Sequence, residues 1–296
     1  MIEGIFVEGL IYAIMALGVF FTFRILDFPD LTVDGSFPMG AVIMASCLHG
    51  GISPLLGLCL AFGGGVLAGL TTAAIHNRLK VPHLLAGILT MTMLYSINIR
   101  ILSNRANLPL LRVDTILTRV HDLTRGILAP EYASLIFFIL VVLGLKVLLD
   151  IFFMTDMGLA FGALGNNEQM IRVQGVNPAT LKSIGVGISN GLVALSGAFA
   201  AQYQGFADVN LGQGIVVSGL ASVMLGEFLL KSNRIWILTL RVVLGTILFK
   251  AIMYLGRYYG YYINMTPNDL KLITGILIII SLAVSNVKRL RNREAA

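Results

Sequence analysis

The sequence predicts an all-α, polytopic transmembrane helical bundle of roughly 8–10 spans, one of them a broken helix. Composition is the first reason. Hydrophobic residues make up 57% of the 296 positions and charged residues only 12%, whereas ordinary globular domains carry about 25% charged residues. The second reason is that the apolar residues fall in successive runs of the length that crosses a bilayer as a helix, about 20 residues.

The apolar runs that meet this length are residues 2–23, 54–75, 84–102, 133–153, 181–202, 212–230, 235–255 and 269–287. The first run has no basic flank and no small-residue cleavage site, so we expect a retained span rather than a signal peptide. Small residues recur at four-residue spacing, as in Ala61, Gly65, Gly69 and Ala73, which lets membrane helices approach closely. Short linkers indicate a single domain over residues 1–296.

The broken helix is predicted between the first two full-length runs. Residues 24–36 (RILDFPDLTVDGS) contain three aspartates and a proline, and they lead into an apolar run, 37–48, that is too short to cross alone. Irregular backbone at membrane depth must be buried in protein or line a wet cavity. Discontinuous helices of this kind mark substrate pathways in many transporters.

Lysine and arginine in short loops predict the orientation, because cytoplasmic loops carry an excess of both. Basic residues lie in the connections 76–83 and 231–234 and in the tail 288–293. Placing these inside also places residues 155–182 inside and the amino terminus outside. The loop 103–130 must then be external, although it contains four arginines.

That external loop has an amphipathic pattern. Apolar residues at 116, 117, 120, 123 and 127 recur at helical spacing, with Arg119, Asp122 and Arg125 elsewhere on the wheel. We expect a helix lying on the outer surface or docked on the bundle. It would serve either as a landing site for an external partner or as a lid over loop ends.

The polar stretch 155–182 has the features of a docking segment. Residues 166–174 can form a short amphipathic helix, with Met170, Ile171 and Val173 on its apolar side, and Gly175 is placed to end it. Asn177 and Pro178 have the pattern of an N-cap and a first-turn proline opening the next helix. The charge is mixed, unlike the basic face of a membrane-surface helix. This favours docking to another protein; an ordinary capped interhelical loop is the alternative.

The motifs of soluble enzymes are absent from the sequence. There is no GxxxxGK[ST] loop for ATP, no Cys/His cluster with metal spacing and no Gly-x-Ser-x-Gly nucleophile elbow. We therefore expect a transport subunit rather than an enzyme, with no cofactor or metal of its own. The net charge of +6 gathers at loop ends and the tail, which does not favour nucleic acid as a partner.

Polar side chains inside apolar runs are costly and are therefore functional candidates. Arg24 is expected to pair with the acidic segment. Lys250 and Arg241 lie in the run 235–255, and Lys250 can either snorkel outward or bind an anionic group. The residues predicted to line a translocation path are Asp27, Asp30, Thr32, Asp34, Ser36, Asn98 and Asn190.

Two stretches carry a family resemblance. Residues 162–206 begin GALGNNEQMIRVQGVNPATLK and continue into a helix rich in small residues. This stretch resembles the membrane permease subunits of bacterial ABC importers of the branched-chain amino-acid and ribose type. The matching positions are Gly165, Asn167, Ile171, Gly175, Val176, Asn177, Ala194, Gly197 and Ala198. Residues 23–41 (FRILDFPDLTVDGSFPMGA) are similar to the segment after the first span, above all in the subgroup of tryptophan/tyrosine transport permeases.

The resemblance implies that residues 155–182 contact cytoplasmic ABC ATPase subunits, which bind ATP and Mg²⁺. It further implies an extracytoplasmic solute-binding protein, a second permease copy in a homodimer or heterodimer, and the bacterial inner membrane. Departures from the sugar permeases at 30–35 and 226–228 favour amino acids. The implied ATPase-docking residues are Gly165, Asn166, Asn167, Glu168, Met170, Ile171, Arg172, Gly175, Val176 and Asn177.

The sequence thus predicts the membrane subunit of a binding-protein-dependent ABC importer that moves a small solute by alternating access. An aromatic or branched-chain amino acid is the expected solute. One alternative is the same role for a nucleoside, sugar or vitamin. Another is an ion-gradient-driven secondary transporter or channel, in which buried carboxylates bind protons or cations.

Overall fold

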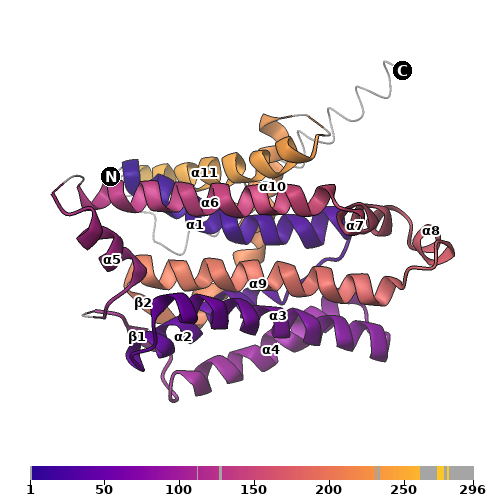
Figure 1. Ribbon diagram of the computed structural model, residues 1–296, viewed down its shortest axis with the longest axis horizontal. Coiled ribbons are helices and arrows are strands. Elements are labelled where there is room, and N and C mark those ends of the chain that lie inside the picture. Colours follow the sequence, from indigo (N-terminus) through magenta and orange to yellow (C-terminus); the bar gives the residue numbers. More distant parts are fainter. Residues whose placement is uncertain are drawn as a thin grey trace.

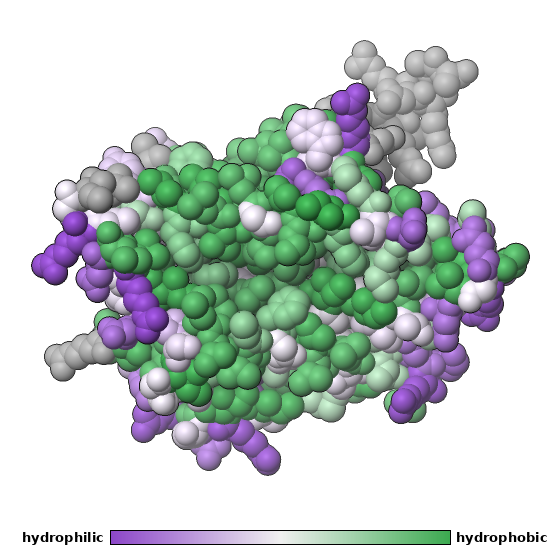
Figure 2. All heavy atoms as spheres, viewed as in Figure 1, coloured by the Kyte–Doolittle hydropathy of each residue, from purple (hydrophilic) through white to green (hydrophobic). Residues whose placement is uncertain are grey.

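The computed structural model describes residues 2–111, 113–126, 129–230, 232, 234–260, 272–276 and 279. Long helices run side by side along the longest axis, with short helices and turns at both ends (Figure 1). Among these residues, seven helices are long and apolar enough to cross a membrane. Figure 2 shows apolar side chains over the middle of the visible face and hydrophilic ones toward the ends. The predicted helical transmembrane bundle is confirmed. Of the predicted span 269–287, only 272–276 and 279 are described.

The long helices are α1 (Ile2–Phe20), α3 (Pro54–Leu79), α4 (His83–Ile101), α6 (Pro130–Met154), α9 (Pro178–Gln204) and α11 (Ile235–Gly260). Two shorter ones are α2 (Val33–His49) and α10 (Ile215–Leu229), and α1 is extended by a π-helix, η1 (Phe21–Ile25). The short helices α7 (Asp156–Asn166) and α8 (Glu168–Val173) lie at one end of the bundle, called here the α8 end. The opposite end holds α5 (Ile116–Leu123) and is called the α5 end (Figure 1).

The α5 end contains a small sheet that the sequence reading did not predict. Strand β1 (Asn107–Pro109) pairs antiparallel with β2 (Phe206–Asp208), so two connections far apart in sequence run side by side. Helix α5 opens with a Thr115 capping box and buries Ile116 and Leu117. The amphipathic helix is therefore confirmed, but it is shorter than predicted: Leu123 is 82% exposed, and residue 127 lies outside the described residues.

Helix α9 is the centre of the bundle and packs against α1, α2 and α3. The small residues predicted as a close-packing ridge lie on the α3 side of this contact: a Cβ at Gly65 or Gly69 would collide with a backbone carbonyl oxygen of α9. Gly40 of α2 is confined in the same way by the carbonyl of Ala194. Three backbones thus approach α9 more closely than larger residues allow.

The predicted break lies at residues 26–32, between η1 and α2. Asp30, in this break, accepts a hydrogen bond from Asn190, which is halfway along the 27 residues of α9. Helix α2 therefore starts at mid-depth in the bundle. It ends at the α5 end, where Leu48 packs with Leu110.

A second break, not predicted, lies before α10. After β2 the chain passes through a 3-10 helix, η2 (Val209–Gly212), and α10 begins at Ile215. The Asp34 carboxylate accepts the Gly214 amide at 3.0 Å, so α10 starts at the same depth as α2. From there it runs to the α8 end, where Glu227 meets Arg24. Two half-helices thus begin at mid-bundle and run to opposite ends, an arrangement typical of solute pathways in transporters.

Candidate functional site

Helix α8 is a short helix held by caps at both ends. The Asn167 side chain accepts hydrogen bonds from the amides of Gln169 at 3.0 Å and Met170 at 3.2 Å. At the other end Gly175 has φ +83° and donates to the Arg172 carbonyl at 3.1 Å. The next amide, from residue 176, donates to the carbonyl of residue 171 at 3.3 Å. This is the Schellman pattern, in which glycine takes the left-handed conformation, so the predicted role of Gly175 as helix terminator is confirmed.

The side chains of α8 divide between anchoring and exposure. Ile171 is 1% exposed and fixes the helix to the bundle, whereas Met170 is 53% and Val173 88% exposed. The predicted single apolar face of these three residues is therefore wrong. The six-residue helix presents two large apolar side chains outward at the α8 end.

Glu168 fixes α8 to α9. Its carboxylate receives Lys182 at 2.8 Å and Arg172 at 2.9 Å. The hydrogen bond and charge of Lys182 hold the pKa of Glu168 below its usual value. Because Lys182 belongs to α9 and Glu168 to α8, this ion pair joins α8 directly to the central helix.

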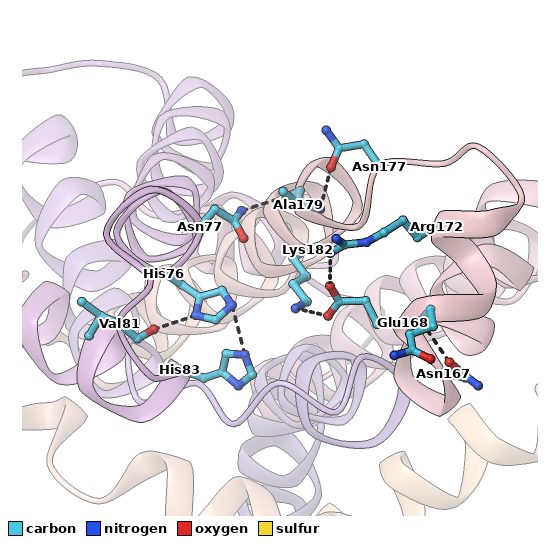
Figure 3. A network of polar contacts seen from close by, with 11 residues as sticks. His76, Asn77, Val81, His83, Asn167, Glu168, Arg172, Asn177, Ala179 and Lys182 are labelled. Atoms are coloured by element: carbon cyan, nitrogen blue, oxygen red, sulfur yellow. Dashed lines mark hydrogen bonds and ion pairs between the residues drawn. The ribbon is translucent and has the colours of Figure 1, made fainter.

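A groove of about 750 Å³ separates α8 from the turn between α3 and α4. Figure 3 shows the two sides: Glu168 and Lys182 face the rings of His76 and His83. The histidine Nε2 atoms are 3.1 Å apart. Asn77 donates to the Ala179 carbonyl at 3.0 Å and so joins α3 to the first turn of α9.

The other predicted docking residues have structural positions on either side of α8. Gly165 and Asn166 belong to the end of α7, and a Cβ at Gly165 would collide with the Ile25 carbonyl of η1. Val176 and Asn177 connect α8 to α9, where the Asn177 side chain accepts the Ala179 amide at 3.0 Å. The N-cap prediction is thus confirmed, while direct contact of all ten residues with a partner stays a prediction.

Four of the predicted path residues meet in one buried network. Asn190 donates to Asp30 at 2.6 Å and accepts from Ser36 at 2.6 Å. Asp30 also accepts the Thr32 amide at 2.8 Å, and the hydroxyls of Thr32 and Thr72 are 2.6 Å apart. All five side chains are 0% exposed. In this conformation the network joins the break to α3 and α9; a solute would reach it only after the helices separate, so its place on a path stays a prediction.

The remaining predicted path residues lie elsewhere. Asn98 donates to the Gly35 carbonyl at 3.3 Å, and its buried side-chain oxygen has no partner among the described residues. Asp34 caps α10, as described above. Asp27 is exposed, with φ +50°, and lines a cavity at the α8 end away from the network.

The sequence predicted that Arg24 pairs with the acidic segment, but in the structure Arg24 pairs with a different carboxylate. Its guanidinium lies 2.9 Å from Glu227, which also receives Arg241 at 3.0 Å. Two cations thus share one carboxylate near the α8 end. The pairing partner could not be found from the sequence, because more than 200 positions separate Arg24 from Glu227.

The structure also contains a buried ion pair that was not predicted from the sequence. Lys146 and Asp150 pair at i and i+4 within α6, and Thr239 of α11 donates to the same carboxylate. The signal was present, since two opposite charges four residues apart interrupt an otherwise apolar run. Within the described part of the chain, no group of three His, Cys, Asp or Glu side chains could hold a metal ion.

Comparison with known proteins shows the family to which the chain belongs. A family model described as the permease component of branched-chain amino acid transport systems matches residues 1–282. A tyrosine transport system permease protein of Clostridioides difficile (strain R20291) is 41% identical over 286 residues, 97% of this chain and 92% of that protein. An uncharacterized protein of Rickettsia prowazekii (strain Madrid E) is 32% identical over 282 residues, 95% of this chain and 96% of that protein. No solved structure gives a significant match.

Proposed function

Because this chain belongs to the family of permease components of branched-chain amino acid transport systems, we propose that it is the membrane subunit of an ATP-driven, binding-protein-dependent importer. The proposed solute is an aromatic amino acid, with L-tyrosine first. The relative named as a tyrosine transport permease supports this choice, since it matches 97% of the chain. The proposed location is the bacterial inner membrane, with the α8 end in the cytoplasm.

The observation that carries the proposal is the outward apolar pair on a rigid helix. Met170 and Val173 are exposed, while Ile171 and the Glu168–Lys182 ion pair fix the helix that carries them. An ATPase subunit that covers this pair can move α8 without unfolding it. Since the sequence has no P-loop, hydrolysis belongs to that separate subunit.

The proposed mechanism transmits motion through α9. Closure of two ATPase subunits displaces α8, and the Glu168–Lys182 contact displaces α9 with it. Asn190, halfway along α9, holds Asp30 at the first break, so a shift of α9 alters the junction where α2 and α10 begin. Solute transfer then requires that inward- and outward-facing states differ in their affinity for solute and partners.

The α5 end is proposed to receive an extracytoplasmic solute-binding protein. The docked helix α5 and the β1–β2 pair give this end an ordered surface. A second permease copy, identical or closely related, completes the pathway.

Reconstitution tests the proposal. The chain would be co-purified with the ATPase and binding protein encoded beside it and placed in liposomes, and uptake of radiolabelled L-tyrosine would be followed with and without internal ATP. Uptake should require both ATP and binding protein and should survive an uncoupler. Uptake that needs no ATP and collapses with the uncoupler would instead establish an ion-gradient-driven transporter.

A further inference from the structure

A cavity of about 550 Å³ lies between α1, α10 and α11, in the half of the bundle toward the α5 end. Its volume falls in the range of small-molecule sites, about 300–1,000 Å³. It extends to Gly214, whose amide is bound by Asp34 at the start of α10. The cavity therefore reaches the depth at which the two half-helices begin.

Charged and aromatic residues line this cavity in two helical stripes. On α11, Lys250, Tyr254 and Arg257 face it at i, i+4 and i+7, and on α1, Glu8 and Tyr12 face it at i and i+4. These spacings place side chains on one face of a helix. The charges are thus aimed at one space from two helices.

A lysine of α11 and a glutamate of α1, which are 242 positions apart in the sequence, form an ion pair in the cavity. The Lys250 ammonium is 3.5 Å from the Glu8 carboxylate and 3.2 Å from the centroid of the Tyr12 ring. The Lys250 side chain is 16% exposed and that of Glu8 40%. Arg257 adds a second cation on the same face.

Apolar side chains fill the rest of the lining: Ile5, Ile215, Val217, Phe249 and Met253. Beside them, Gln213 and Ser218 contribute polar side chains to the lining. A lining that is mostly apolar, with a few convergent polar groups, is typical of sites for small organic ligands.

We propose that this cavity binds the transported amino acid as a zwitterion, a conclusion that rests on the proposed function for the class of solute. Glu8 holds the ammonium group, Lys250 and Arg257 hold the carboxylate, and the apolar lining beside Tyr12 holds the aromatic ring. A zwitterion replaces the Glu8–Lys250 contact with two charge pairs of its own. Its two charges are therefore compensated when it leaves water, which is the condition for burying them.

A phosphatidylethanolamine head group contains the same pair of opposite charges as an amino acid. The test therefore separates binding of the free amino acid from binding of the lipid. The permease alone, in nanodiscs made only of phosphatidylglycerol, should bind radiolabelled L-tyrosine in equilibrium dialysis. Addition of phosphatidylethanolamine to the nanodiscs should leave this binding unchanged. Loss of tyrosine binding on that addition would assign the cavity to lipid and overturn the proposal, as would no binding in either membrane.

Analogues that lack one charge test the assigned roles. Tyramine lacks the carboxylate and 3-(4-hydroxyphenyl)propionate lacks the ammonium group, and each should bind at least about tenfold more weakly than L-tyrosine, because a hydrogen bond to a charged group is lost. Lys250→Met together with Arg257→Gln should remove the preference over tyramine, since both cations hold the carboxylate. Glu8→Gln should remove the preference over the propionate. Asp122→Asn and Arg119→Gln, on α5 at the same end, should keep both preferences.

A change in preference distinguishes direct contact with the ligand from a purely structural role of the ion pair. If the role were purely structural, each substitution would change the affinities for both analogues equally. Each of these variants leaves charge without its neighbour, so the triple variant E8Q/K250M/R257Q serves as a second test. It should fold, by size-exclusion chromatography, and should bind all three compounds within about threefold of one another. Wild-type preferences in Glu8→Gln, in K250M/R257Q or in the triple variant would overturn the proposal.

Uptake by the complete complex separates this inference from the proposed function. ATP-driven uptake of L-tyrosine that is unaffected by Glu8→Gln and Lys250→Met would overturn the binding site while leaving the importer intact. Tyrosine binding that follows these preferences, without any ATP-driven uptake by wild type, would leave the site and refute the importer.

Discussion

Replacing Gly175 with valine should weaken docking of the ATPase to α8. Gly175 has φ +83°, a conformation that costs L-residues about 1–2 kcal/mol, and a β-branched residue at least as much. No heavy atom outside its own neighbours lies within 4 Å of a Cβ built at this position. The effect of the substitution therefore comes from backbone conformation and not from a collision.

The strain acts on a helix of only six residues. Relief of the strain requires the loss of the two hydrogen bonds that end α8, made by the amides of Gly175 and Val176. A free-energy cost of 1–2 kcal/mol changes a population ratio by about 5–30-fold. If the ordered helix is the form that binds, affinity for the ATPase falls by up to the same factor.

The assay is the dissociation constant of the purified permease and ATPase, measured together with ATP-driven uptake. Gly144→Val is the matched control, because Gly144 lies within α6, outside residues 155–182, and a Cβ there also meets nothing within 4 Å. Gly175→Asn should bind nearly as wild type, since asparagine tolerates the left-handed region. Unchanged affinity and uptake in Gly175→Val would refute the assignment of α8 as the docking helix.

Three further predictions concern stability. Gly40→Val should abolish a monodisperse peak in fluorescence-detected size-exclusion chromatography, because its Cβ would collide with α9, whereas Gly144→Val, with open space around it, should not. Asn190→Ala should lower the unfolding temperature by leaving the buried Asp30 carboxylate short of a donor, a loss of about 1–3 kcal/mol; an unchanged temperature would show that the network contributes no stability. Glu168→Gln should be less stable than wild type above the ordinary glutamate pKa of about 4.3. This difference in stability should shrink as pH falls through the lowered pKa of Glu168 in the folded protein. A constant difference down to pH 3 would contradict the ion-pair assignment.

The caps of α8 and α9 could be predicted because capping is local. Asn167, Gly175 and Asn177 act within a few residues of their own positions, so the order of residue types contains the information. The direction of Met170 and Val173 could not be predicted. Of the side chains of α8, the bundle buries only Ile171. A six-residue helix is too short for its periodicity to define a face.

The first break could be predicted, but the second could not. Three aspartates and a proline interrupt residues 24–36, whereas residues 209–214 (VNLGQG) contain no charged residue or proline and run directly into the predicted span 212–230. Their irregular backbone depends on Asp34, a residue 180 positions away. An interaction at that separation leaves no periodic signal in either segment.

By itself the sequence determined that the chain is a helical membrane bundle, where most helices lie, and how the α8 segment is capped. These properties follow from transfer of side chains into lipid and from hydrogen bonds between near neighbours, and both depend on local order. Only the tertiary structure decided that α2 and α10 start together at mid-bundle, that Arg24 pairs with Glu227, and that Glu8 and Lys250 share one cavity. Each of these joins distant segments, and the choice of partner is set by how the helices pack around α9.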